Sequence, residues 1–93
     1  MIKHIVLFTV KEGEDKDRVA AIAASVLEPL CGQIEGLLYA EVKRCFNGVD
    51  FALYTELKDR EALTYYADHP LHTEAKSHFF HLLSGRTAAD YEV

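Results

Sequence analysis

The stretch IKHIVLFTVK, residues 2–11, predicts a strand that is apolar on both faces. From Lys3 to Val10 it is rich in β-branched and aromatic side chains, and a charged, glycine-containing segment ends it. Alternate residues of a strand point to opposite faces, so Ile5 and Leu7 share one face. The other face carries His4, Val6, Phe8 and Val10. Both faces need cover, and we expect helices on the His4 face and a second layer on the Leu7 face.

A helix and a hairpin follow. The helix begins at about Asp15, has an acidic first turn, and ends near Pro29. Leu37–Cys45 and Phe51–Leu57 predict two strands, and the turn-forming pair Asn47-Gly48 joins them as a hairpin. The helix has a core-facing stripe of Val19, Ile22, Ala23, Val26, Leu27 and Leu30.

Two more helices are predicted, with a break between them. Asp59 caps a helix that runs towards Ala67. Pro70 disfavours a helical conformation at His69, so the first of these helices ends there and the next runs from Pro70 to about Leu83.

The end of the chain completes a ferredoxin-like order. Ser84-Gly85 is expected to turn the chain, and Arg86–Glu92 to form a fourth strand. The order β-α-β-β-α-β predicts an α+β fold in which helices cover one face of a four-stranded antiparallel sheet. We expect residues 1–93 to form a single domain that homodimerises through the open sheet face carrying Ile5 and Leu7.

Composition excludes several classes of partner. The 93 residues carry a formal charge of −5, and the ten Lys and Arg residues are scattered, which argues against nucleic-acid binding. The uncharged run 5–10 is too short to span a membrane and is not followed by a signal cleavage site, so we expect a cytoplasmic protein with no membrane partner. Cys31 and Cys45 are expected to be reduced thiols.

Four of the five histidines lie between Tyr65 and His81. Helical periodicity places His72 within the apolar stripe of the last helix, which includes Phe79, whereas His81 points away from it. The pair His69-x-x-His72 lacks the third ligand and the spacing of a metal site, so no metal is predicted.

Two readings of His72 remain open from the residues alone. A neutral, partly buried imidazole in the first turn after Pro70 can act as a general base, and the turn can bring the Tyr66 hydroxyl close as a hydrogen-bond donor. Alternatively, His72 is a core histidine and Tyr66 an ordinary buried aromatic residue. His4 similarly either caps the core or lines a cavity.

The segments IKHIVLFTVK, YYADHPLHTEAK and RTAADYEV together resemble the stress-responsive A/B barrel (Dabb) family over essentially the whole chain. The resemblance implies a dimeric α+β barrel. In one branch, similar to olivetolic acid cyclase, a tyrosine and a histidine that match Tyr66 and His72 carry an aldol condensation. The chain departs from that branch at Phe51 and at Lys76.

These observations define a candidate site and two classes of function. One is a cofactor-free cyclase, lyase or isomerase with His72 and Tyr66 as catalytic residues. The other is a non-catalytic stress-associated dimer or small-ligand-binding protein. The related dimeric-barrel monooxygenases rank third, because their motifs are absent. The candidate substrate-binding residues are His4, His69, Val6, Phe8, Phe51 and Phe79.

Overall fold

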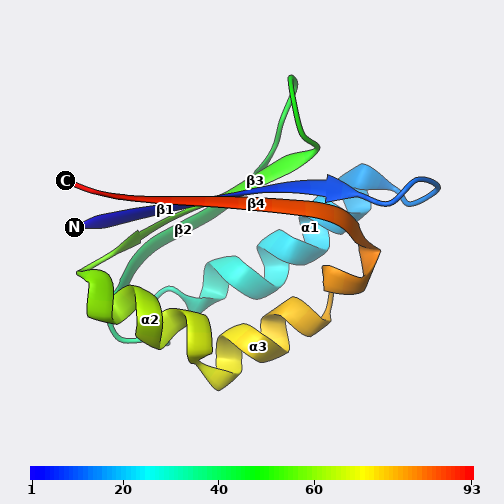
Figure 1. The fold of residues 1–93 in the computed structure, drawn as a ribbon. Helices are drawn as coiled ribbons and strands as arrows, with labels where there is room; N and C mark the ends of the chain where they lie inside the picture. The colour runs from blue at the N-terminus through cyan, green and yellow to red at the C-terminus, as the bar shows by residue number, and fades with distance from the viewer.

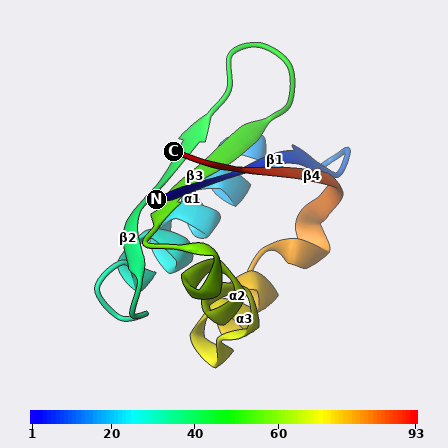
Figure 2. The same cartoon turned by 60° about the vertical axis from the view of Figure 1, so that its left-hand side comes forward.

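Strand β1 (Ile2–Val10) lies inside a four-stranded antiparallel sheet of order β2-β3-β1-β4. The computed structural model describes residues 1–93. The three longer helices lie on one side of the sheet and leave the opposite face bare (Figures 1 and 2). This is the predicted ferredoxin-like arrangement. None of the helices combines the length and the hydrophobicity needed to cross a bilayer.

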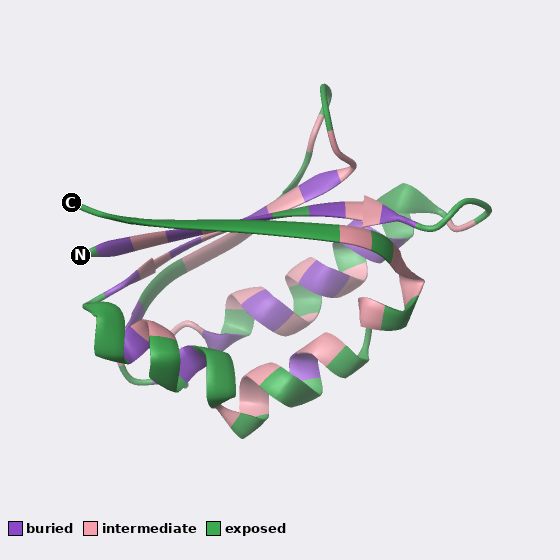
Figure 3. Cartoon of the chain, in the orientation of Figure 1, coloured by how far each residue is buried: buried purple, intermediate pink, exposed green.

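The two faces of β1 differ as the alternation predicts. Every second residue from Ile2 to Val10 is buried against the helices, and His4 is among them. On the other face, Leu7 keeps 38% of its surface exposed. Strand β4 (Leu83–Glu92) is exposed along nearly its whole length (Figure 3). The open face therefore carries an apolar centre on β1 with nothing covering it.

Helix α1 (Lys16–Leu27) has the predicted boundaries. The Asp15 carboxylate caps it by accepting a hydrogen bond from the Arg18 amide, 3.1 Å away. Pro29 falls in a short 3₁₀ turn, η1 (Glu28–Leu30), that ends the helix. Val19, Ala20, Ala23 and Leu27 are buried against the sheet.

The hairpin and the second helix also form where predicted. Strands β2 (Leu37–Arg44) and β3 (Phe51–Leu57) pair in antiparallel register, joined by a loop rather than a two-residue turn. Helix α2 (Arg60–Asp68) is capped by Asp59, whose carboxylate accepts from the Ala62 amide at 2.8 Å.

The last helix is shorter than predicted. Helix α3 (Pro70–Ser77) ends before Phe79, whose φ of −141° lies outside the helical range, and the 3₁₀ turn η2 (Phe80–Leu82) follows. Phe79 is fully buried and packs against Phe8, with 5.8 Å between ring centroids. Because this ring is buried in the core, the helix does not continue to Leu83 as predicted.

The predicted turn at Ser84-Gly85 is also wrong. Both residues lie within β4, and Gly85 pairs opposite Thr9 next to an irregularity in the β1–β4 register. The chain reverses earlier, in η2, where the Lys11 amide donates to the Leu82 carbonyl at 2.9 Å.

Gly36→Ala is expected to destabilise the fold more than Gly48→Ala. Both glycines have φ near +87°, so both substitutions strain the backbone. A Cβ at Gly36 would lie 2.6 Å from the Ala62 Cβ, whereas one at Gly48 meets nothing within 4 Å. We expect Gly36→Ala to cost about 1–3 kcal/mol more in the free energy of unfolding. Urea denaturation of the two variants measures the difference, and equal losses would show that α2 shifts freely.

Candidate functional site

The break between α2 and α3 brings Tyr66 and His72 together. His69 is extended (φ −67°, ψ 136°) because Pro70 follows it, so the chain changes direction between the two helices. The Tyr66 and His72 rings then lie against each other, with 4.3 Å between centroids and 38° between planes. Six residues of separation become a direct contact.

His72 is held in one tautomer when neutral. Its Nδ1 lies 3.2 Å from the Ala67 carbonyl oxygen, which can only accept, so Nδ1–H donates and Nε2 keeps the lone pair. Burial lowers the pKa of His72 to about 4, and the charge of Lys76 adds to the effect. At neutral pH the ring is therefore uncharged, with Nε2 able to accept a proton.

Tyr66 carries a hydroxyl without a partner. The residue is 1% exposed, and its oxygen makes no hydrogen bond. Burial raises the pKa of Tyr66 above its usual value, so the phenol stays protonated. Buried polar atoms are nearly always paired, so an unpaired hydroxyl on a ring that contacts His72 marks a candidate binding group.

A cavity between sheet and helices contains His72. Its wall includes four of the other sequence-predicted residues: His4, Val6, Phe8 and Phe79. Lys76, Phe80 and Arg86 also line it. The free volume is about 20 Å³, which holds about one water molecule.

His4 pairs with a residue for which the sequence predicted no role. Its Nδ1 contacts the Asp90 carboxylate on β4, directly opposite in the strand register. His4 also meets the Tyr66 ring edge-on, at 6.3 Å between centroids. Asp90 therefore fixes the orientation of an imidazole beside Tyr66. The sequence analysis missed Asp90 because its pairing with His4 depends on the register between β1 and β4, which is known only from the fold.

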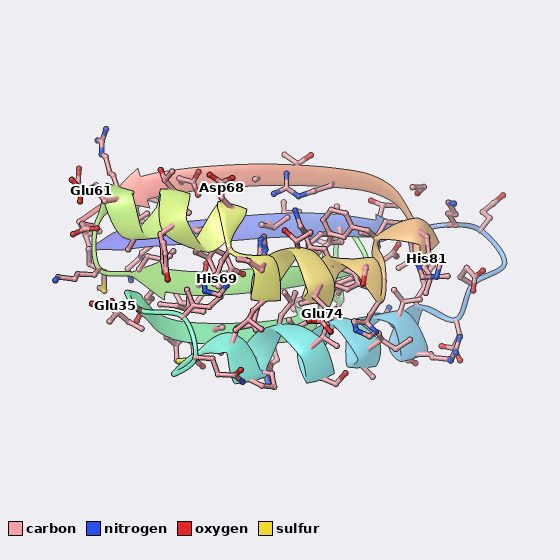
Figure 4. All side chains as sticks on the ribbon, turned by 90° about the horizontal axis from the view of Figure 1, so that it is seen from below. Glu35, Glu61, Asp68, His69, Glu74 and His81 are labelled. Atoms are coloured by element: carbon pink, nitrogen blue, oxygen red, sulfur yellow. The ribbon has the colours of Figure 1, made fainter.

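Three predicted site residues do not line the cavity: Tyr66, His69 and Phe51. Tyr66 is linked to it through its contact with the His72 ring. His69 caps α3, accepting the Leu71 amide at Nδ1 (3.1 Å), and stands at the helix break in Figure 4. Phe51 is fully buried and stacks on Phe8 with 4.8 Å between centroids. Both have roles in packing or capping. His81 is exposed.

A wider groove of about 450 Å³ lies at the other end of α2, where Figure 4 labels Glu35 and Glu61. The ionisable side chains that line it, which also include Lys58, Asp59 and Tyr65, are all exposed. It lacks a buried group able to act in chemistry, so we place the candidate site at the narrower cavity. No three histidine, cysteine or carboxylate side chains converge as metal ligands would.

The depressed pKa of His72 predicts a pH dependence of stability. In the unfolded chain His72 protonates near pH 6.5, but in the folded chain only near pH 4. Between these values the unfolded state binds more protons, so this contribution to stability is present above pH 6.5 and is lost as the pH falls towards 4.

His72→Gln should remove that part of the pH dependence. Urea denaturation of both proteins between pH 4 and 7 tests this, since the other titrating groups are common to both. Parallel stability curves would mean that the imidazole titrates normally. Ring-proton NMR gives the pKa of His72 directly.

Comparison with known proteins agrees with this fold. The family model described as "Stress responsive A/B Barrel Domain" (Dabb) matches residues 2–93. An uncharacterized protein of Streptomyces coelicolor is 32% identical, with 99% of each chain covered. A dimeric, ferredoxin-like protein of unknown function from Bacteroides fragilis superposes with a TM-score of 0.89 at 28% identity, covering 99% of this chain and 95% of that one. A second dimeric, ferredoxin-like protein of unknown function, from Thermobifida fusca, superposes with a TM-score of 0.82 at 25% identity, covering 99% of this chain and 90% of that one. Because the family model matches nearly the whole chain, the chain belongs to the Dabb family of stress-responsive A/B barrel domains.

Proposed function

We propose that His72 and Tyr66 form a cofactor-independent acid–base site acting on a small carbon acid. The observation that carries this proposal is the buried Tyr66 hydroxyl, which has no partner in the protein and belongs to a ring that packs against His72. Leaving such a donor unpaired costs about 1–3 kcal/mol. A substrate oxygen is the partner that would remove this cost.

The proposed step moves one proton. His72 Nε2 takes a proton from the carbon beside a carbonyl, the C–H electrons form a carbon–carbon double bond, and the carbonyl π electrons move onto oxygen. The Tyr66 hydroxyl donates to that oxyanion. The enolate carbon then attacks a second carbonyl of the same substrate, whose oxygen takes the proton from His72. The result is cyclase-like aldol chemistry, and its reverse is a lyase reaction.

A non-catalytic ligand-binding dimer is the alternative. The narrowness of the cavity favours it, because a space of about 20 Å³ admits a ligand oxygen but not a substrate folded for an intramolecular condensation. In that case the Tyr66 hydroxyl would hold a ligand oxygen without any proton transfer.

Exchange of carbon-bound hydrogen separates the two functions. In D₂O, proton NMR follows the loss of α-hydrogens from a small ketone such as 4-oxopentanoate. We expect the protein to accelerate the exchange, with His72→Gln lowering the rate about 10²- to 10⁴-fold and Tyr66→Phe about 10²- to 10³-fold.

His81→Gln is the matched control, because it changes an exposed histidine of the same segment. Binding of the ketone without any accelerated exchange would support the ligand-binding alternative. Exchange that survives in both site variants would remove His72 and Tyr66 from the mechanism.

We further propose that the protein is a homodimer joined through the open sheet face. The neighbours from Bacteroides fragilis and Thermobifida fusca are described as dimeric. On this chain the open face has Ile5 and Leu7 at its centre, with Tyr54 paired opposite Ile5. Covering this face with a second copy removes the exposed apolar surface from water.

Leu7→Asp is expected to dissociate the dimer. The two-fold axis would bring two carboxylates into a buried apolar interface without partners. Ala21→Asp places the same charge on the outer surface of α1, where Ala21 is exposed, and should leave the mass unchanged. Sedimentation at micromolar concentration compares them. An unchanged mass for Leu7→Asp would place the interface elsewhere.

A further inference from the structure

We infer that the substrate of this site carries a carboxylate, which Lys76 and Arg86 bind at the mouth of the cavity. The inference rests on the proposed function and names its substrate class, a short oxo acid. Lys76 comes from α3 and Arg86 from β4, so the two cations reach the cavity from different elements.

Neither cation is paired within the protein. The five ion pairs of the structure involve Lys3, His4, Lys16, Arg44 and Arg60. Lys76 instead lies 5.3 Å from the centre of the Phe80 ring. Asp90, the acidic residue of β4 on the same face as Arg86, is occupied by His4. In a chain with fifteen acidic and ten basic residues, two unpaired cations at one cavity form a local site for an anion.

The positive charges of Lys76 and Arg86 influence the protonation of His72 and Tyr66. Lys76 and Arg86 both lower the pKa of His72, and Arg86 lowers that of Tyr66. A bound carboxylate would offset both positive charges and raise the pKa of His72. The substrate would thereby strengthen the base that acts on it, since a pKa nearer the working pH favours proton abstraction.

The shape of the cavity sets which end of the ligand enters. Lys76 and Phe80 are half-buried and Arg86 is exposed, so these side chains form the solvent-facing side of the cavity. The inner wall is formed by Val6, Phe8 and Phe79, which are buried and apolar. A carboxylate therefore remains at the rim, where the guanidinium and ammonium groups can hydrogen-bond to it. The ketone end would then face His72, which requires Lys76 and Phe80 to move outward, because the cavity as it stands holds about one water molecule.

The probes are 4-oxopentanoate and its methyl ester, which share the ketone and differ in charge. We expect the acid to bind the parent protein about tenfold more tightly, the effect of two partly exposed ion pairs. Added salt should reduce that preference. Binding of the acid, followed by NMR, should raise the pKa of His72, whereas the ester, which brings no negative charge, should not raise it.

The double variant Lys76→Gln/Arg86→Gln should bind both probes equally. Lys11→Gln, an exposed cation outside the cavity, is the control and should keep the preference. Equal affinity of acid and ester for the parent, binding of neither, or a preference that persists in the double variant would each overturn the inference.

The exchange experiment keeps the two proposals distinguishable. Charge-selective binding without α-hydrogen exchange would leave the carboxylate site standing and remove the proposed catalysis. Equal exchange rates for acid and ester, with His72 required for both, would leave the catalysis standing and remove the carboxylate site.

Discussion

Pairing of β1 with both β3 and β4 is the constraint on which the rest of the structure depends. It places His4 and Phe8 beneath the helices and Leu7 on the open face. It also brings the C-terminal strand against the N-terminal one, so residues near the two ends of the chain meet at one cavity. Fold, site and proposed dimer all follow from the two-sided character of this strand.

The first three strands and the first two helices could be predicted because their signals are local. Alternation assigned each residue of β1 to a face, and Asp15 and Asp59 marked the helix starts through their capping side chains. The end of α3 could not be predicted in this way. Phe79 continues the helical spacing in sequence, but its contacts with Phe8 and Phe51 belong to the folded core.

For the candidate site, too, the residues that could be predicted are those with local signals. A proline after His69 was enough to predict that Tyr66 and His72 could approach, since the effect of proline on the preceding residue is local. Asp90 and Arg86 needed the register between strands at opposite ends of the chain, with 86 residues separating His4 from Asp90. Phe51 and His69 were predicted to bind substrate, but their own surroundings make Phe51 a core ring and His69 a helix cap.

The unpaired hydroxyl of Tyr66 also creates a trade-off between the stability of the protein and its proposed function. Phenylalanine fits the same space and lacks the unpaired hydroxyl oxygen, so a phenylalanine at this position would make the fold more stable. Evolution in the laboratory that rewards heat resistance alone would drift towards phenylalanine at position 66. Tyrosine is retained at position 66 only where selection also acts on its hydroxyl group.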